Sequence, residues 1–247
     1  MSYSVCMATY NGARHVERQL RTILSELGPD DEVIIVDDSS RDDTVAVIEQ
    51  IDDRRIRVLR NERNRREVQS FSRALVEARN DVVFLADQDD VWVQGRVTLM
   101  AGALEKSGAD VVTSNFDWMD DAELPVDIPF DGVRASASRQ HLRNIADIFI
   151  GRTNYFGCAM AMRREFVPLI APIPSFVESH DLWIAIASNL FRTNVHLDSK
   201  TLHKRKHDSN ATSVVSTRSL RKKLWSRVLF GWSLLVLMHR LWRIGTR

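Results

Sequence analysis

The segment Asp87-Gln88-Asp89-Asp90 carries three carboxylates and directly follows an apolar run. Carboxylates held this close repel one another unless a positive charge lies among them. A hard divalent cation with oxygen ligands can supply that charge, and Mg²⁺ usually binds the phosphates of a substrate as well. The alternative is a solvated acidic turn, so a metal site is indicated only if the surrounding residues agree.

Two further polar segments follow apolar runs in the first forty residues. Thr9-Tyr10-Asn11-Gly12 comes after the first run, and Asp37-Asp38-Ser39-Ser40 after the second. The Asp38 carboxylate can accept hydrogen bonds from a nucleobase N–H or a ribose hydroxyl, with the Tyr10 ring against the base. Alternatively, Tyr10 fills the core, and Asp37-Asp38 is an ordinary turn in which Ser40 or Asp42 caps the next helix.

His180-Asp181 and Arg205-Lys206-His207 are the polar segments of the second half. Ser179 or Asp181 can cap the helix that begins here. The helix dipole would also keep Asp181 ionised, so that it could accept a proton from a hydroxyl nucleophile, and the two roles are compatible. The basic segment is either a solvated surface or a clamp for a diphosphate, in which His207 can also complete a metal shell.

Short apolar strands that alternate with helical patterns must position these residues. The pattern predicts an α/β fold with a mostly parallel sheet and helices on both faces. Ligands of such sheets bind beyond the carboxyl ends of the strands, where the first three polar segments lie. The second half is less regular. We expect strands over residues 3–10, 32–36, 56–59, 81–86, 109–116, 156–162 and 195–197, helices over 12–27, 42–51, 71–79, 96–106 and 180–190, and a loop over 122–137.

The charge of the chain is unevenly distributed. Residues 201–247 contain 11 Lys and Arg and a single acid, a charge of +10, whereas the rest of the chain carries −9. This asymmetry predicts an acidic globular domain over residues 1–215 and a basic, amphipathic helical tail over residues 216–247 that meets an anionic surface.

The apolar centre of the tail, residues 228–238, is shorter than the ~20 residues that a bilayer span requires. Trp225, Trp232 and Trp242 suit a membrane surface. We therefore expect peripheral attachment to the inner face of the cytoplasmic membrane. The alternative is a helix that docks on the domain or in a dimer interface.

The cysteines and the first residues bear on the compartment. Cys6 and Cys158 lie in apolar, strand-like runs, which predicts buried thiols in a reducing environment. The N-terminus has no basic region followed by a long apolar stretch, so no signal peptide is predicted and a cytoplasmic location is expected.

Six segments, in this order, resemble family 2 glycosyltransferases of the GT-A fold, and among them the bacterial rhamnosyltransferase-like enzymes of polysaccharide assembly. The resemblance runs from about Tyr3 to Asn210, with two departures: Ser70 stands where Asn is common, and Lys204 where an aromatic residue often precedes Arg205. The segments are Ala8-Thr9-Tyr10-Asn11-Gly12, Val36-Asp37-Asp38-Ser39-Ser40-Arg41-Asp42, Phe84-Leu85-Ala86-Asp87-Gln88-Asp89-Asp90-Val91-Trp92, Gly157-Cys158-Ala159-Met160, His180-Asp181-Leu182-Trp183 and Arg205-Lys206-His207-Asp208-Ser209-Asn210.

The resemblance implies an inverting transfer of a sugar, with rhamnose as one candidate, from a nucleoside-diphosphate sugar to a hydroxyl of a glycan or lipid-linked acceptor. It implies Mg²⁺ or Mn²⁺ as cofactor, held by Asp89, Asp87 and His207, and Asp181 as general base. The residues implied in binding the nucleotide-sugar are Thr9, Tyr10, Asn11, Asp38, Asp87, Gln88 and Arg205.

Two other functions are weighed against this one, and nucleic-acid binding is not expected. A nucleotidyltransferase that makes a nucleotide-sugar usually has a Gly-rich phosphate loop after its first strand, which residues 9–14 (TYNGAR) lack. A non-catalytic regulatory domain with an acidic pocket would not need His180-Asp181 or the His207 segment. The sequence leaves the sugar, the acceptor and the oligomeric state open.

Overall fold

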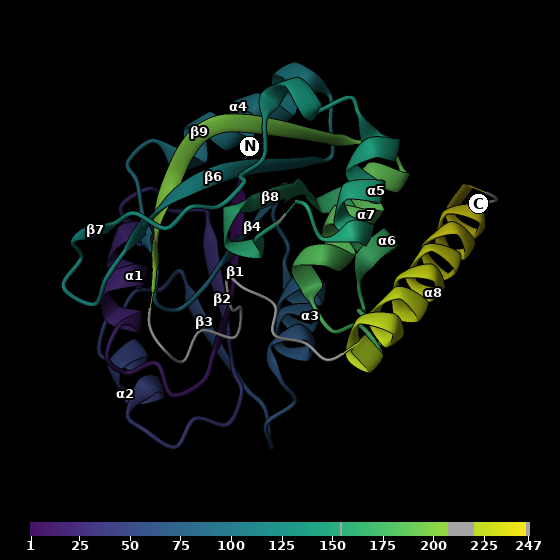
Figure 1. Cartoon of the computed structure of the whole chain (residues 1–247). Coiled ribbons are helices and arrows are strands. Elements are labelled where there is room, and N and C mark those ends of the chain that lie inside the picture. The colour runs from purple at the N-terminus through teal and green to yellow at the C-terminus, as the bar shows by residue number, and fades with distance from the viewer. Residues whose placement is uncertain (154, 207–219, 246–247) are drawn as a thin grey trace.

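The computed structural model describes residues 1–153, 155–206 and 220–245. The predicted α/β architecture is confirmed: one curved sheet lies between two groups of helices (Figure 1). The order of strands along the sheet is β3-β2-β1-β4-β8-β6-β9-β5, and β7 pairs with the free part of β6.

The first four strands of the chain form a parallel half-sheet, as predicted. Helices cover both faces, and the apolar runs are buried except in the strand at the edge of the sheet, which is partly exposed. Each predicted range agrees with the observed strand to within one residue at either end. The strands are β1 (Tyr3–Thr9), β2 (Glu32–Asp37), β3 (Ile56–Arg60) and β4 (Val82–Ala86).

The second half-sheet is mixed rather than parallel. β8 runs antiparallel to both β4 and β6, β5 runs antiparallel to β9, and β6 runs parallel to β9. The expectation of a mostly parallel sheet is therefore correct for the first half of the chain and incomplete for the second. The strands are β5 (Val91–Trp92), β6 (Val111–Met119), β7 (Pro125–Val126), β8 (Met160–Arg163) and β9 (Asn194–Arg205).

The last strand is much longer than residues 195–197, the predicted range. β9 continues to Arg205, and both Lys204 and Arg205 are buried within it. The prediction ended the strand early because basic residues usually lie at the surface, whereas these two have acidic and carbonyl partners inside the protein. The basic segment therefore begins inside the sheet.

Alternation along the strands divides the core into two layers. In β1, Cys6 faces one layer, and Val5 and Met7 face the other. One layer contains α3 (Glu67–Glu77), α5 (His141–Ile150), α6 (Val167–Ile170) and α7 (His180–Leu190), and the other contains α1 (Val16–Leu24), α2 (Thr44–Glu49) and α4 (Arg96–Ser107). Both cysteines are buried and free, as predicted.

Three segments differ from the sequence-based expectation. Helix α5 was not predicted, and the expected loop over 122–137 contains the short strand β7 and a 3₁₀ turn, η1 (Ala135–Ala137). The expected strand over 156–162 begins late because Gly157–Ala159 forms a 3₁₀ turn, η2. A further turn, η3 (Arg164–Phe166), precedes α6.

Helix α8 (Leu220–Gly245) lies against the edge formed by α6 and α7 (Figure 1). Its inner face packs Phe230, Leu234 and the fully buried Leu237 into the core layer of α7. The tail is thus helical, as predicted, and docks on the domain along one side. The proposed boundary between residues 215 and 216 lies outside the described residues. Among the described helices, none combines the length and apolar character needed to cross a bilayer.

Candidate active site

Asp38 and Thr9 meet at the carboxyl ends of β2 and β1. The backbone N–H of Asp38 donates to the carbonyl oxygen of Thr9 at 2.8 Å. The Oδ1 atom of Asp38 accepts from Asn61 Nδ2 and from the backbone N–H of Arg65, both at 2.8 Å. The Asp38 carboxylate is therefore buried and held in one orientation. Asn61 was not predicted, because a single Asn in a loop gives no sequence signal.

Hydrogen bonds join the three loops that follow β1, β2 and β4. The backbone N–H of Tyr10 donates to Gln88 Oε1 at 3.0 Å, and Gln88 Nε2 donates to the Tyr10 carbonyl at 3.2 Å. Asn11 adopts a φ of +48° and accepts from the backbone N–H of Arg41 at 2.9 Å. The Tyr10 ring is 42% exposed, so it is not a core residue. The predicted convergence of the loops after β1, β2 and β4 is confirmed.

Lys204 reaches into the acidic segment from β9. Its Nζ donates to Asp87 Oδ2 at 2.6 Å and lies 3.8 Å from Asp90 Oδ2. Burial would raise the pKa of Asp87, but the ammonium of Lys204 outweighs burial and lowers it. Burial would likewise lower the pKa of Lys204, yet Asp87 and Asp90 raise it well above the ordinary value. Both side chains are therefore charged at neutral pH.

The Arg205 guanidinium binds backbone carbonyl groups in and beside the acidic segment. Its Nε donates to the carbonyl oxygen of Asp89, and one of its terminal nitrogens donates to that of Asp120, both at 2.9 Å. Its backbone N–H donates to Asp90 Oδ1 at 3.1 Å. Arg205 is 2% exposed. The contact of Arg205 with the nucleotide-sugar stays a prediction; as part of β9, Arg205 directs its guanidinium into the protein, where it fixes the backbone of the segment.

His180 lies between two carboxylates at the start of α7. Its Nε2 is 2.7 Å from Asp181 Oδ1, its Nδ1 is 3.4 Å from Glu67 Oε1, and its ring stacks on Phe71. Burial lowers the pKa of His180, but Asp181 and Glu67 more than compensate and raise it to about 9. Burial raises the pKa of Glu67 to about 7, with Asp87 and Asp181 adding to the increase. Glu67 and the role of His180 were missed, since a single acid in a polar stretch of sequence gives no signal.

The start of α7 combines a cap with the predicted base. The Ser179 hydroxyl oxygen accepts from the backbone N–H of Leu182 at 3.2 Å, so Ser179 is the N-cap. Asp181 is thus not required as the cap. Gly157 lies so close to this helix that a β-carbon added to it would be 2.5 Å from Asp181 Oδ1 and 2.7 Å from His180 Nε2. A glycine at position 157 therefore leaves the space that the His180-Asp181 pair occupies.

The acidic residues differ in how well they fit a metal ion. Among the described residues, Asp87, Asp90 and Cys158 bring three candidate ligand atoms within 4.8 Å of one another. The Lys204 ammonium already contacts all three, and burial raises the pKa of the Cys158 thiol so that it stays protonated. This cluster does not fit a hard cation. Of the other two expected ligands, Asp89 is partly exposed and lies outside this cluster, and His207 lies outside the described residues.

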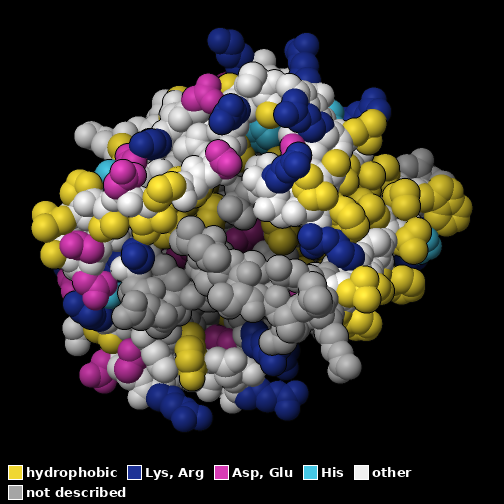
Figure 2. All heavy atoms as spheres, in the orientation of Figure 1, with side chains coloured by type: hydrophobic (Ala, Val, Ile, Leu, Met, Phe, Trp, Pro, Cys, Tyr) yellow, Lys and Arg dark blue, Asp and Glu magenta, His cyan; other side chains and the backbone are white. Residues whose placement is uncertain are grey.

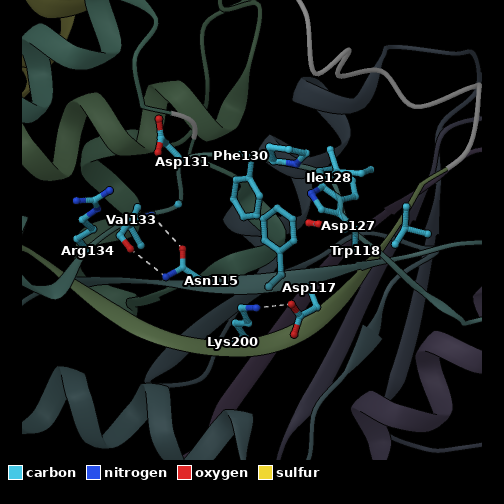
Figure 3. Close-up of a pocket in the computed structure, with 14 residues that line it drawn as sticks. Asn115, Asp117, Trp118, Asp127, Ile128, Phe130, Asp131, Val133, Arg134 and Lys200 are labelled. Atoms are coloured by element: carbon cyan, nitrogen blue, oxygen red, sulfur yellow. Dashed lines mark hydrogen bonds and ion pairs between the residues drawn. The ribbon is translucent and has the colours of Figure 1, made fainter.

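A pocket of about 370 Å³ lies beside β6 and β9 and under residues 126–134 (Figure 3). Its wall includes Trp118 and Phe130, and Lys200 pairs with Asp117 at its edge. The residues predicted to bind the nucleotide-sugar do not line this pocket. The pocket is therefore a separate feature from the acidic segment, although Trp118 packs edge-on against Phe156, the ring beneath Lys204.

Comparisons with known proteins relate this chain to glycosyltransferases. Residues 4–168 match the family model described as glycosyl transferase family 2. An uncharacterized glycosyltransferase of Nostoc is 26% identical over 70% of this chain and 54% of its own length. The succinoglycan biosynthesis protein ExoO of Rhizobium meliloti is 31% identical over 45% of this chain and 32% of its own length.

Two further proteins extend the comparison to donors and acceptors. WfgD of Escherichia coli, a UDP-Glc:α-D-GlcNAc-diphosphoundecaprenol β-1,3-glucosyltransferase, is 23% identical over 46% of this chain and 45% of its own length. Residues 1–349 of Staphylococcus aureus TarS, solved with UDP-GlcNAc, are 18% identical with a TM-score of 0.69, over 98% of this chain and 72% of that one. The chain spans about half or less of the length of these curated relatives, and the likeness to TarS concerns the fold.

Proposed function

Because this chain belongs to glycosyl transferase family 2, we propose that it moves a sugar from a nucleoside-diphosphate sugar to a hydroxyl of a glycan or lipid-linked acceptor during polysaccharide assembly. The observation that carries the proposal is that Asp38 and Asp87 lie at the carboxyl ends of parallel strands, and that Asp181, at the start of α7, lies near Asp87. WfgD uses a nucleotide-sugar and a lipid-linked acceptor, and TarS binds UDP-GlcNAc, which supports the same classes of donor and acceptor here. Rhamnose is one candidate for the sugar.

The donor would bind across the ends of β1, β2 and β4. The Asp38 carboxylate, oriented by Asn61, would accept a hydrogen bond from the nucleobase, with Thr9 beside it and the exposed Tyr10 ring against the base. Asn11, Gln88 and Asp87 would meet the ribose and sugar hydroxyls. Family membership favours this arrangement over nucleotide-sugar synthesis and over a regulatory acidic pocket.

Asp181 would act as the general base. Its carboxylate takes the proton of the acceptor hydroxyl, the acceptor oxygen forms a bond to the anomeric carbon, and the bond from that carbon to the diphosphate oxygen breaks with its electron pair leaving on the nucleotide. A single displacement from the opposite face inverts the anomeric carbon. His180 holds Asp181 in position, with Phe71 and Glu67 fixing the imidazole.

Asp89 would hold Mg²⁺ or Mn²⁺, with His207 as a second ligand. The bound ion supplies positive charge to the leaving diphosphate. Arg205 contributes indirectly, since its bond to the Asp89 carbonyl fixes the backbone from which that carboxylate projects.

Helix α8 would hold the enzyme on the inner face of the cytoplasmic membrane, near a lipid-linked acceptor. Its outer face exposes large apolar side chains, and Figure 2 shows apolar atoms gathered on the side of the molecule where α8 lies. The helix contains six Lys and Arg and no acid. Apolar and aromatic side chains on a cationic helix are typical of binding to an anionic leaflet. The exposed residues are Leu224, Trp225, Val228, Trp232, Leu235, Met238, Leu241 and Trp242.

A thermal-shift screen of nucleoside diphosphates tests the donor site. A nucleotide that binds only the folded state raises the unfolding temperature. We expect one nucleoside diphosphate to stabilise the wild type and to lose most of that effect in Asp38→Asn. A folded wild type that none of the nucleoside diphosphates stabilises, with or without Mn²⁺, contradicts the proposed site.

A further inference from the structure

Helix α5 turns three large apolar side chains to the outside. Leu142, Phe149 and Ile150 are 73%, 40% and 47% exposed, and their spacing of two helical turns places them along one side of the helix. The opposite side packs on α7 and buries Ile148 and Asn144, whose Nδ2 donates to a side chain of α7 at 2.9 Å. Helix α5 thus buries a polar residue while larger apolar ones are exposed, and such an apolar surface marks an interaction site.

The exposed side of α5 is continuous with that of α8. The rings of Phe149 and Phe230 lie 5.3 Å apart, and the Arg227 guanidinium lies 5.0 Å from the centre of the Phe149 ring. Leu224 and Val228, both more than half exposed, lie within about one turn of Arg227 along α8. Figure 2 shows apolar side chains gathered over the region where α5 and α8 lie. We call this region the α5–α8 surface, and its exposed apolar residues are Leu142, Phe149, Ile150, Leu224, Trp225 and Val228.

The charge of the α5–α8 surface favours an anionic bilayer as its partner. Residues 139–152 and helix α8 together contain nine Lys and Arg and one acid, Asp147, whose carboxylate lies 3.7 Å from Arg143. Arg139, Arg143 and Arg152 are exposed. Cationic helices with apolar and aromatic side chains bind anionic leaflets. A second copy of this chain would instead bring the same cations against one another, because a symmetric dimer pairs a surface with itself.

The α5–α8 surface borders the helix that carries the proposed base. In the same part of α8 that contacts α5, the Ser226 hydroxyl donates to Glu178 Oε2 at 3.2 Å. Glu178 directly precedes Ser179, the N-cap of α7, and Asp181 lies in the first turn of that helix. A bilayer on the α5–α8 surface would therefore lie beside the start of α7, where a lipid-linked acceptor has to meet Asp181.

We propose that α5 shares the membrane contact with α8, so that Leu142, Phe149 and Ile150 enter the interfacial layer of an anionic leaflet while Arg143 and Arg152 meet its headgroups. The inference rests on the proposed function, which gives this contact to α8. A protein attached by one helix can rotate about the axis of that helix. A second contact through α5 fixes the orientation of the domain and keeps the start of α7 close to the leaflet.

Cosedimentation of the full chain with vesicles of equal parts phosphatidylcholine and phosphatidylglycerol tests the share of α5. Changing Leu142, Phe149 and Ile150 together to Ser should weaken binding by about tenfold or more, because three large side chains lose an apolar environment. The double variant Leu142→Ser with Ile150→Ser spares the packing of Phe149 on α8 and decides if the triple variant does not fold. Its matched control, Val76→Ser with Leu124→Ser, removes two exposed apolar side chains elsewhere and should bind as the wild type does.

The cations of α5 should contribute separately. Arg143→Gln with Arg152→Gln should weaken binding about fivefold for each charge removed, since a basic residue near an anionic leaflet adds attraction. The difference from the wild type should shrink as salt is added, because salt screens exposed charges.

A fluorescent probe on α5 reports the contact directly. Cys6 and Cys158 are buried, so a polarity-sensitive maleimide dye on the folded Ile150→Cys variant labels the new thiol. Anionic vesicles should shift its emission to shorter wavelengths, whereas the same dye on Leu124→Cys should not respond.

Three results would overturn the inference. In the first, the wild type binds the vesicles, the α5 variants bind equally well and the dye on Ile150→Cys stays silent, which would leave α8 as the contact. In the second, a folded wild type does not bind anionic vesicles, which would contradict the contacts of both helices. In the third, analytical ultracentrifugation shows a dimer that the α5 changes dissociate while vesicle binding is unaffected, which would assign the surface to a second copy. Thermal shifts with nucleoside diphosphates report separately on the donor site, so their absence would count against sugar transfer and not against the membrane contact.

Discussion

The Nε2 atom of His180 lies 2.7 Å from Oδ1 of Asp181, the next residue in the chain. Neighbouring residues in a helix rarely face each other, and here both side chains turn toward the space left by Gly157. The imidazole is buried and stacks on Phe71. Burial lowers its pKa, but its two carboxylate neighbours outweigh burial and raise the pKa to about 9. Asp181 thus lies beside a fixed cation.

The Asp181→Asn variant tests whether Asp181 acts as a general base or only caps helix α7. General-base assistance typically contributes ~10²–10⁴-fold, so kcat should fall by about that factor while nucleotide binding is retained. Ser179→Ala is the matched control, because it removes the observed cap. It should cost about 1 kcal/mol of stability and leave kcat nearly intact. An Asp181→Asn enzyme with wild-type kcat would refute the assignment.

Gly157→Ala should disturb the His180-Asp181 pair without removing a functional group. The added β-carbon would press on Asp181 Oδ1 and His180 Nε2, so we expect a reduced kcat and a stability loss of roughly 1–3 kcal/mol. Gly102→Ala, in the middle of α4 with no atom near the new methyl, should instead be neutral or stabilise by about 0.5–1 kcal/mol. Urea denaturation and steady-state rates compare the two, and an equal effect of both changes would show that Gly157 is not needed for space.

The free energy of unfolding should depend on pH through the protonation of His180. Its pKa rises from 6.5 to about 9 on folding, so the folded state binds the proton more tightly. That stabilisation is fully present below about pH 6.5 and is lost as the pH rises through about 9. Above pH 7.5 Glu67, whose pKa in the folded state is about 7, is mostly ionised. His196, whose pKa burial lowers to about 4, is neutral in both the folded and the unfolded state.

Urea unfolding between pH 7.5 and 9.5 measures this effect. The wild type should lose stability with rising pH more steeply than His180→Gln. Parallel curves for the two proteins would mean that His180 is not protonated in the folded state.

The parallel half of the sheet and three of its loops could be predicted because their signals are local. Buried strands appear in the sequence as apolar runs. Thr9 ends the first of these strands, and Asp38 and Asp87 directly follow the second and the fourth. Lys204 could not be assigned in the same way, because the burial of a lysine depends on a partner 117 residues away. Arg205 belongs to a basic motif that the sequence singles out, but its contacts with Asp89 and Asp120 follow from the length of β9, which was not predicted because basic residues usually end a buried strand.

Removal of the metal should abolish transfer if Asp89 holds a required ion. We expect EDTA to reduce turnover to background and Mn²⁺ or Mg²⁺ to restore it, since the leaving diphosphate would otherwise carry its charge uncompensated. Asp89→Ala should be inactive and should not be rescued by added ion. Turnover that is unaffected by EDTA would contradict the metal requirement while leaving Asp181 and Asp38 unaffected.

The outer face of α8 should control attachment to lipid. Trp225, Trp232 and Trp242 are each more than half exposed. Changing all three to Ser in the full chain should strongly reduce cosedimentation with vesicles that contain anionic lipid, because interfacial binding scales with buried apolar area. The control changes three exposed apolar residues outside α8, Val76, Leu99 and Leu124, to Ser. Equal loss in both variants, or no loss in either, would argue against α8 as the membrane contact.

The central claim is that this chain uses Asp181 to transfer a sugar from a nucleotide. The most direct test incubates the full chain with UDP-, dTDP- and GDP-sugars and undecaprenyl-diphosphate-linked saccharides, and follows nucleotide release together with the mass of the acceptor. We predict that one donor gives nucleotide and an acceptor heavier by one sugar with the wild type, and that Asp181→Asn forms neither while binding the same nucleoside diphosphate. An Asp181→Asn variant that forms the product as fast as the wild type, or a folded wild type that neither binds nor consumes any of these donors, would contradict the account.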